Sequence, residues 1–312
     1  MSAIWFDHFM TFTSATNIDD YLAEYVAQGF VTHEQTVRHP PGLRNGFISL
    51  GPDYLEFCWV EDETQFAASA DHQVFRTGKR PFGIGMIAQD IQALHNDWLA
   101  RGYVVPQITS RAPSDAPADS PPAWSFQEIP HDLLPGCLCF ALTYHTRTRD
   151  ERIEVRGGPN TIYALSGVTF VTGEAEIRAM RWRDLLAPEE SLVTSESGFT
   201  IQIGPHLVTW MTPDACLTTY GQPWITSPHV YGDLALVHIL ATDLEQARIV
   251  LEHAGRRVIP HTTNGQEALL IKPDPRDGVT FLVLQQPIAI WLQERTARTG
   301  EQITYSSDAQ LQ

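Results

Sequence analysis

Two residues near the start of the chain, His8 and Glu56, have side chains that bind metals and move protons. Each lies in an apolar stretch, IWFDHFMTF and DYLEFCWVE, that is typical of a β-strand. Because side chains alternate along a strand, each shares its face with apolar or aromatic neighbours: Phe6, Met10 and Phe12 for His8, and Tyr54 and Cys58 for Glu56. An ionised carboxylate on such a face is costly to bury without a partner, and a metal ion is a suitable one. This pattern indicates a metal ligand at Glu56 that also accepts protons.

Several common catalytic motifs are absent from the sequence. It contains no GxSxG nucleophile motif, no phosphate-binding GxxxxGK[ST] loop and no HExxH zinc motif. The stretches GFISLGPD and GFTIQIGP have the pattern of a strand followed by a turn. Because no GxGxxG dinucleotide-binding fingerprint is present, we do not expect a nicotinamide or flavin enzyme.

The composition argues against nucleic-acid and membrane partners. The chain has 312 residues, with 21 Lys and Arg against 37 Asp and Glu, and a formal net charge of −16. Such a surface repels phosphate groups and anionic lipids. The start, MSAIWFDHFMTF, lacks the features of a signal peptide, and no apolar run approaches the roughly 18 residues of a membrane span. With four cysteines in no zinc-ribbon spacing, we predict a cytoplasmic protein, monomer or homodimer, that binds a small molecule.

The first unit of the chain has the order strand, helix, strand, strand, strand. After IWFDHFMTF, the segment IDDYLAEYVAQGF predicts an amphipathic helix with Asp19 and Asp20 in its first turn and Gly29 at its end. FVTHEQTVRH, LRNGFISLG and DYLEFCWVE then predict three strands separated by turns that contain Pro and Gly.

This order of elements recurs three more times, from Pro81, Pro159 and Asp233. The repeat indicates that four βαβββ units fill nearly the whole chain. We predict two units in residues 1–145, two more in residues 159–290, and a frayed polar tail over 293–312. Residues 111–123 lie outside the repeat and form either a surface insertion or a lid over the site.

The first unit resembles the glyoxalase-like domain family of the vicinal-oxygen-chelate superfamily, which includes glyoxalases, bleomycin-resistance proteins and extradiol dioxygenases. The resemblance rests on FDHF in the first strand, on RHPPG and RNGFISLG, and on DYLEF in the last strand. It implies an α+β fold in which four βαβββ modules form paired, open, cup-shaped mixed sheets around a metal. Members usually carry a His ligand on the first strand and a Glu ligand on the last, the positions of His8 and Glu56 here.

Superposing the four units gives two series of equivalent positions: His8, Gly85, Gly167 and His238 on the first strands, and Glu56, Cys139, Thr209 and Thr280 on the last. If units one and four face each other, His8, Glu56 and His238 form a two-His, one-carboxylate site for one divalent metal, Fe, Mn, Ni or Zn. If neighbouring units pair instead, His238 lies far from Glu56, and the third ligand comes from His145 or His39.

Other residues are candidates for contact with a substrate: Arg44, His39, Tyr54 and His145. Arg44 flanks a Pro-Pro-Gly turn and is suited to an anionic or carbonyl group. Tyr54, Tyr144 and Trp210 lie near strand positions that either line the cup or pack in the core.

Three functional hypotheses follow. The leading one is a metal-dependent glyoxalase-like enzyme that acts on a small oxygen-bearing molecule by lyase, isomerase or ring-opening chemistry, through a metal-stabilised oxyanion with Glu56 as the catalytic residue. The second is an extradiol-type ring-cleaving dioxygenase, which needs a permuted ligand arrangement because Thr280 stands where unit four should carry Glu. The third is a metal-free protein that sequesters a small molecule or an antibiotic.

Overall fold

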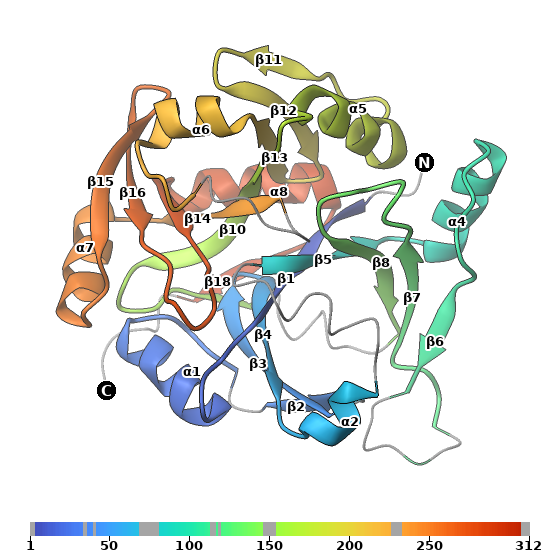
Figure 1. Ribbon diagram of the computed structural model, residues 1–312, viewed down its shortest axis with the longest axis horizontal. Helices are drawn as coiled ribbons and strands as arrows, with labels where there is room; N and C mark the ends of the chain where they lie inside the picture. Colours follow the sequence, from blue (N-terminus) through green and yellow to red (C-terminus); the bar gives the residue numbers. More distant parts are fainter. Residues whose placement is uncertain are drawn as a thin grey trace.

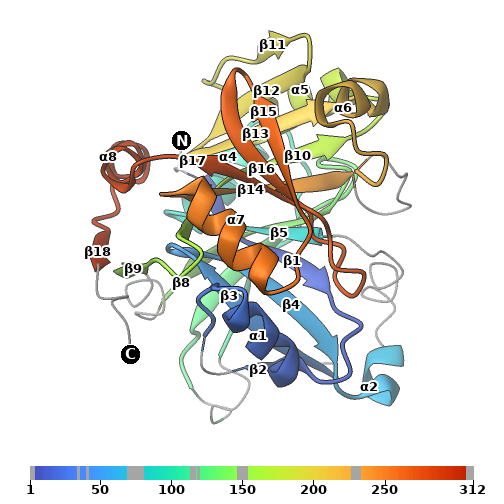
Figure 2. The ribbon, with the colours of Figure 1, turned by 90° about the vertical axis from the view of Figure 1, so that its left-hand side faces the viewer.

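The computed structural model contains two eight-stranded sheets (Figures 1 and 2) and describes residues 4–33, 36–39, 42–68, 81–112, 117, 120–145, 154–225 and 233–306. The first sheet has the strand order β2-β3-β4-β1-β5-β8-β7-β6. Its strands are β1 (Ile4–Phe12), β2 (Val37–His39), β3 (Leu43–Leu50), β4 (Asp53–Val60), β5 (Pro81–Ala88), β6 (Thr109–Arg111), β7 (Trp124–Ile129) and β8 (Leu138–Tyr144).

The second sheet repeats this topology with the order β11-β12-β13-β10-β14-β17-β16-β15. Its strands are β10 (Ile162–Val171), β11 (Val193–Ser195), β12 (Gly198–Ile203), β13 (His206–Met211), β14 (Leu234–Ala241), β15 (Val258–Thr263), β16 (Gln266–Ile271) and β17 (Phe281–Gln285). The predicted fold class, α+β with paired cup-shaped mixed sheets, is confirmed.

The pairing at the centre of each sheet decides which units face each other. β1 pairs antiparallel with β5, and β10 pairs antiparallel with β14. Units one and two therefore share the first sheet, and units three and four share the second. Neighbouring units pair, and the hypothesis that units one and four face each other is wrong.

Each unit has a helix after its first strand, as the sequence predicts: α1 (Ile18–Ala27), α4 (Ile91–Ala100), α5 (Ala175–Leu186) and α7 (Leu244–His253). Asn17, Asp90 and Asp243 cap the starts of α1, α4 and α7, since their side chains accept hydrogen bonds from first-turn N–H groups. These three helices end at glycines with positive φ of 82°, 85° and 81°: Gly29, Gly102 and Gly255. Local start and stop signals thus place the helices alike in three units.

The remaining described elements are α2 (Glu63–Ala67), α6 (Pro213–Tyr220), α8 (Ile288–Thr299), β9 (Glu154–Arg156) and β18 (Thr304–Ser306). α8 and β18 occupy much of the segment that the sequence predicts to be a frayed tail, so that expectation is wrong up to residue 306. Among the described residues, no helix is both long and apolar enough to cross a membrane.

The first sheet curls strongly. β2 and β7 are six strands apart in the sheet order, which is roughly 29 Å if the sheet is flat. The ring centroids of His39 on β2 and Trp124 on β7 nevertheless lie 6.5 Å apart. The sheet therefore has a concave face, called here the first cup, and the corresponding face of the second sheet is the second cup.

One large apolar core joins the two sheets and their helices on the faces opposite the cups. It includes Phe9 and Phe57 of the first sheet, Phe170 and Val237 of the second, and Trp98 of α4. Because strand side chains alternate, the residues between these positions point into the cups.

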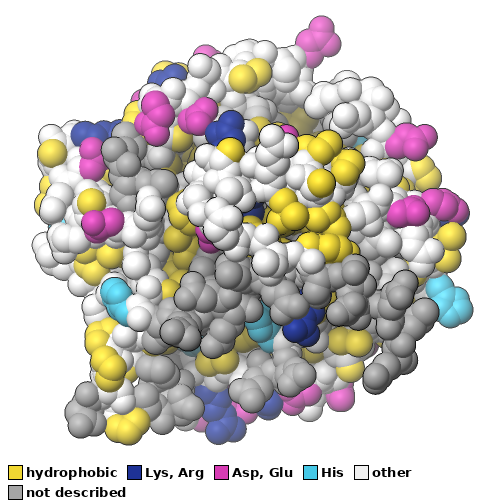
Figure 3. Space-filling view, turned by 180° about the vertical axis from the view of Figure 1, so that it is seen from behind, with side chains coloured by type: hydrophobic (Ala, Val, Ile, Leu, Met, Phe, Trp, Pro, Cys, Tyr) yellow, Lys and Arg dark blue, Asp and Glu magenta, His cyan; other side chains and the backbone are white. Residues whose placement is uncertain are grey.

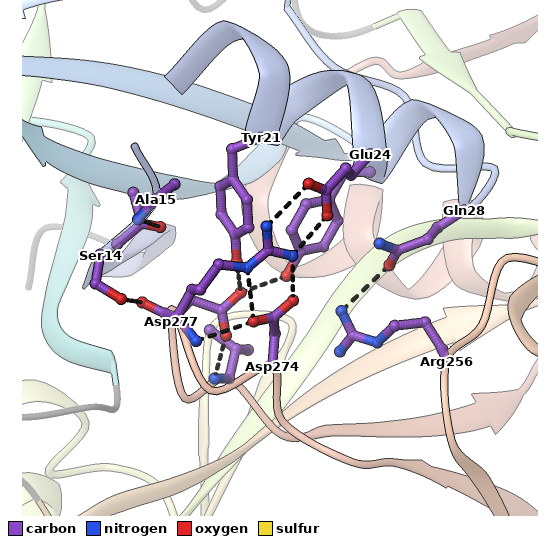
Figure 4. A network of polar contacts seen from close by, with 12 residues as sticks. Ser14, Ala15, Tyr21, Glu24, Gln28, Arg256, Asp274 and Asp277 are labelled. Carbon is purple, nitrogen blue, oxygen red and sulfur yellow. Dashed lines mark hydrogen bonds and ion pairs between the residues drawn. The ribbon is translucent and has the colours of Figure 1, made fainter. Parts of the chain in front are cut away.

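Polar contacts also join the first unit to the last (Figure 4). Asp277, in the loop before β17, is fully buried and accepts hydrogen bonds from the hydroxyls of Tyr21 and Tyr25 on α1. Burial raises the pKa of the Asp277 carboxyl. At the edge of this network, Arg276 pairs with Glu24 of α1 at 2.6 Å. These contacts hold α1 against the second half of the chain.

A buried ion pair makes a second connection between the halves. Arg295 of α8 is fully buried and donates to both carboxylate oxygens of Asp53, at 2.6 and 2.8 Å. Nε2 of His206, on β13, lies 3.1 Å from the same carboxylate. Nδ1 of His206 accepts a hydrogen bond from the backbone N–H of Phe6, so Nε2 is the nitrogen that donates to Asp53.

Candidate active site

A β-bulge in β1 brings Asp7 and His8 to the same face of the first sheet. The register with β5 pairs Phe6 with Met86 and His8 with Gly85, so Asp7 is the extra residue. Both Asp7 and His8 turn into the first cup, where they contact each other. Phe6 packs in the core on the opposite face, which corrects the expectation that it shares a face with His8.

Gly85 leaves the space that the His8 imidazole fills. A Cβ atom at position 85 would lie 2.1 Å from Cε1 of His8, far inside van der Waals contact. The predicted first-strand series is confirmed by direct cross-strand pairing, His8 with Gly85 in one sheet and Gly167 with His238 in the other. One imidazole and one glycine therefore face each other at the centre of each sheet.

The His8 ring is held on several sides. Nδ1 lies 2.9 Å from Oδ2 of Asp7, and Nδ1 is the donor because an ionised carboxylate only accepts. Tyr54 stacks on one side of the ring with centroids 4.6 Å apart, and Phe140 lies at 5.4 Å. The other nitrogen, Nε2, lies 3.6 Å from Oε2 of Glu56.

Glu56 and Asp7 are two buried carboxylates with separate partners. Glu56 is 6% exposed, and its Oε1 accepts a hydrogen bond from Nδ2 of Asn45 on β3. Asp7 is fully buried, and its Oδ2 accepts a second hydrogen bond from the hydroxyl of Tyr144 at 2.9 Å. Tyr144 also lies 3.5 Å from the hydroxyl of Tyr54. His8 thus belongs to one connected group with five polar side chains, Asp7, Tyr54, Glu56, Asn45 and Tyr144.

Apolar side chains surround this polar group. Two clusters line the first cup: Met10, Phe12, Leu43, Cys58, Phe66 and Phe82 on one side, and Trp5, Ile87, Leu142, Phe126, Phe140 and Tyr144 on the other. Burial, together with the charge of Glu56, raises the pKa of the Cys58 thiol well above its usual value. Cys58 therefore remains a thiol, and the first cup is an apolar setting in which electrostatic interactions are strong.

The second cup has a different polar content. Nε2 of His238 lies 2.8 Å from Oγ1 of Thr169, and burial lowers the pKa of His238 to about 4. The bulge residue of β10 that corresponds to Asp7 of β1 is Ser166. Thr209 stands where β4 has Glu56. The positions that carry acids in the first cup therefore carry hydroxyls in the second.

A helix also fills part of the second cup. Cys216 and Tyr220 of α6 pack in one apolar cluster with Leu236, Leu270 and Leu282 of the second sheet. His238 therefore lies in an apolar, partly filled cup of another sheet, and it does not join His8 and Glu56. The prediction that His238 is their third metal ligand is corrected by the pairing of the units.

The strand register also corrects the last-strand series. In the first unit Glu56 lies two residues beyond Tyr54, the partner of His8. The same offset gives Leu142 in unit two, beyond the Gly85–Phe140 pair, and Leu284 in unit four, beyond the His238–Leu282 pair. The prediction that Thr209 is equivalent to Glu56 is confirmed, whereas the same prediction for Cys139 and Thr280 is wrong. Cys139 packs in the core on the opposite face.

Three predicted residues lie away from His8. Arg44 donates to Thr36 and Asp19 on the side of the sheet that carries α1. His145 is exposed, and its Nε2 lies 2.7 Å from Oγ of Ser125. His39 lies beside Trp124 at the edges of the curled sheet. Of the predicted substrate-binding residues, the structure brings Tyr54 to His8.

Two residues of this group are absent from the sequence prediction, Asp7 and Asn45, and Tyr144 appears in it only as a residue of the cup wall or core. Asp7 precedes His8 in FDHF, but regular alternation assigns it to the opposite face. The bulge that reverses this assignment has no glycine or proline to mark it. Asn45 is in the predicted strand LRNGFISLG. Alternation places its side chain in the cup once the register of β3 with β4 is known.

The paired βαβββ units, the two curled sheets, and a His and a Glu on the first and last strands of one unit define a protein of the vicinal-oxygen-chelate fold. The profile of the glyoxalase-like domain matches residues 6–186, more than half of the chain. The chain therefore belongs to this family. No curated protein matches it.

Solved structures of low sequence identity share the fold. A catechol 2,3-dioxygenase is 10% identical, with a TM-score of 0.54 over 90% of this chain and 87% of that one. A mutant of 4-hydroxymandelate synthase from Streptomyces coelicolor is 14% identical, with a TM-score of 0.56 over 97% and 100%. A hypothetical protein from Staphylococcus aureus is 11% identical, with a TM-score of 0.56 over 91% and 100%.

Proposed function

We propose that the chain is a metal-dependent enzyme whose active site lies in the first cup, where His8 and Glu56 hold one divalent cation. The observation that carries this proposal is the position of two atoms able to bind a metal, Nε2 of His8 and Oε2 of Glu56, which face each other 3.6 Å apart. Because Asp7 takes the proton-bearing Nδ1, a neutral His8 presents a lone pair at Nε2. In this tautomer Nε2 and Oε2 are both acceptors, so a cation bound between them is favourable.

The residues present fit a metal. Metal–nitrogen and metal–oxygen bonds of about 2.1 Å at a tetrahedral angle place two ligand atoms roughly 3.4 Å apart. The separation of 3.6 Å is close to this value and longer than a hydrogen bond. Two carboxylates, Asp7 and Glu56, are buried in an apolar cup, and a divalent cation offsets their charge. No set of three or more His, Cys, Asp or Glu able to hold an ion occurs in the described ranges, so other ligand types must complete the site.

The chain's own residues have separable roles. Asp7 orients His8 by accepting its Nδ1–H, which keeps Nε2 free as a ligand. The Tyr144 hydroxyl, bonded to the same Asp7 oxygen, can donate a proton to a substrate oxygen that enters the cup. Glu56 is the carboxylate that accepts a proton from a substrate carbon or from water. A bound metal supplies Lewis acidity to an oxygen of the substrate, which stabilises an oxyanion.

This arrangement is suited to lyase, isomerase or ring-opening chemistry on a small molecule with a reactive oxygen. Aromatic walls, including Phe126 and Phe140, give the site an apolar surrounding, which strengthens electrostatic interactions there. A ring-cleaving dioxygenase is the second candidate, supported by the fold shared with catechol 2,3-dioxygenase. It ranks lower because unit four, one of the two units that usually bear the metal in such enzymes, has Leu284 at the Glu position.

The partners and location of the chain are also proposals. We infer a small-molecule substrate and no nucleic-acid partner, since Lys and Arg side chains lie at separate points on the face seen in Figure 3. A cytoplasmic location is supported by the four cysteines, which are all buried free thiols.

Metal content measured by mass spectrometry, on protein purified without chelator, tests the proposal. We expect about one equivalent of a transition metal in the wild type and its loss in Glu56→Ala. His238→Ala is the matched control, because it removes an imidazole from the equivalent position of the second cup, and we expect it to keep the metal. Absence of metal from the wild type, after reconstitution with Fe, Mn, Ni and Zn in turn, would favour a metal-free binding protein.

A further inference from the structure

Asn45 carries a buried amide group beside Glu56 in the first cup. It is 4% exposed and lies on β3, which pairs antiparallel with β4. In this register Asn45 faces Cys58 and Phe47 faces Glu56, so the Asn45 side chain lies diagonally next to Glu56 in the first cup. Nδ2 of Asn45 donates a hydrogen bond to Oε1 of Glu56.

The carbonyl oxygen of this amide has no partner. Oδ1 of Asn45 is buried and makes no hydrogen bond. Exchanging the amide's oxygen and nitrogen does not remove the problem, because the oxygen would then face a carboxylate oxygen of Glu56, and both atoms are acceptors. A buried acceptor without a partner lowers stability, and in native proteins such an atom is usually satisfied by another protein group, an ordered water or an ion.

We propose that Asn45 is the third protein ligand of the metal site, binding the cation through Oδ1. This inference rests on the proposed function. The Nδ2–H of Asn45 holds Oε1 of Glu56, which leaves Oε2 for the cation, and the amide carbonyl is a ligand of the kind that hard divalent cations accept. The protein donors are then one imidazole, one carboxylate and one amide. An amide also explains why a cation site is consistent with the absence of a third His, Cys, Asp or Glu in the described ranges.

Two substitutions separate the carbonyl of Asn45 from its N–H group. Asn45→Asp keeps an oxygen in place of Oδ1 and loses the N–H that bonds Glu56, whereas Asn45→Leu has a similar shape and loses both. The measurement is the dissociation constant of Mn²⁺, determined by titration of chelator-treated protein with detection of free Mn²⁺ by electron paramagnetic resonance. We expect Asn45→Leu to weaken Mn²⁺ binding at least about tenfold and Asn45→Asp to bind as tightly as the wild type or more tightly.

The melting temperature, Tm, of the same variants gives a second test. In Asn45→Asp two carboxylates lie side by side, so we expect a lower Tm than wild type without metal and a larger rise in Tm when Mn²⁺ is added. Equal weakening in Asn45→Asp and Asn45→Leu would overturn the inference, because the N–H group would then be the part that matters. Unchanged affinity in Asn45→Leu would overturn it as well. If Asn45→Leu does not fold, Asn45→Ala replaces it in the same comparison.

Failure of the proposed function has a different signature. In that case wild-type protein binds no Mn²⁺, or Glu56→Gln binds it as tightly as the wild type. If instead Glu56→Gln loses Mn²⁺ while both Asn45 variants keep wild-type affinity, the metal site stands and the role of Asn45 is wrong.

Discussion

Nε2 of His8 lies 3.6 Å from Oε2 of Glu56, although the two residues are on different strands. β1 and β4 run parallel, and Glu56 lies two residues beyond Tyr54, the partner of His8. The ring reaches the carboxylate because Asp7 holds its other nitrogen and Gly85 leaves space opposite it. The position of the imidazole thus depends on Asp7 and Gly85, which lie outside the proposed pair of metal ligands.

Asp7→Asn tests the orienting role of Asp7. An amide can donate to Nδ1 of His8, which favours the tautomer with the proton on Nε2 and removes the lone pair that we propose as a metal ligand. We expect the affinity for Mn²⁺ to fall about 10- to 100-fold, with little change in Tm. Ser166→Ala, at the equivalent bulge of the second sheet, is the matched control and should leave the affinity unchanged. Equal effects of the two substitutions would contradict the role of Asp7.

Gly85→Ala tests the space opposite His8. The added methyl group would overlap Cε1 of His8, which must turn away from Glu56 or push the strands apart. We expect loss of metal binding and a decrease of roughly 1–3 kcal/mol in the free energy of unfolding. Gly173→Ala is the control, since a Cβ there meets no atom within 4 Å and should change neither quantity appreciably. Retention of metal by Gly85→Ala would show that the imidazole position is not critical.

The order of elements could be predicted from the sequence because its signals are local. Alternating apolar residues gave the strands, and the residues that cap α1, α4 and α7 together with Gly29, Gly102 and Gly255 marked the helices. The placement of His8 and Glu56 on the cup face could be predicted because an imidazole and a carboxylate stand on apolar strand faces.

The rest of the site depends on long-range pairing that one sequence does not contain. Whether unit one pairs with unit two or unit four is decided by packing across the whole chain. In unit two the sequence predicts Cys139 at the position equivalent to Glu56, whereas the structure places Leu142 there, three residues further along the strand. A shift by an odd number of residues exchanges the two faces of a strand. The bulge at Asp7 caused the same kind of error within β1.

Arg295→Met tests the buried ion pair between the halves. The substitution leaves the carboxylate of Asp53 buried with one fewer partner, so we expect a loss of about 3–5 kcal/mol in the free energy of unfolding. The control is Arg298→Met on the same helix, whose exposed pair with Glu190 should contribute less than about 1 kcal/mol. Denaturant titration of both variants checks the difference. A cost at Arg295 no larger than that at Arg298 would exclude a stabilising role for the buried pair.

Burial of His238 makes the free energy of unfolding depend on pH. Its pKa in the folded protein is lowered to about 4 by burial, below the usual 6.5, so the unfolded chain binds more protons in this window. The contribution of His238 to stability is therefore present above pH 6.5 and falls as the pH decreases from 6.5 to 4, by about 3 kcal/mol in full.

His238→Gln is the variant that isolates this effect, because Gln carries no titrating group. We expect the difference in unfolding free energy between wild type and His238→Gln to shift against the wild type as the pH decreases through this window. A difference that is constant from pH 7 to pH 4 would mean that His238 is not buried as a neutral group.

The proposed position of the cation is tested most directly by crystals of the protein grown with Mn²⁺, with diffraction data collected at a wavelength where manganese scatters anomalously. We predict one strong anomalous peak in the first cup, within about 2.3 Å of both Nε2 of His8 and Oε2 of Glu56, and no peak at His238. A first cup without a peak, or a peak bound at another part of the chain, would contradict the assignment of His8 and Glu56 as the metal site.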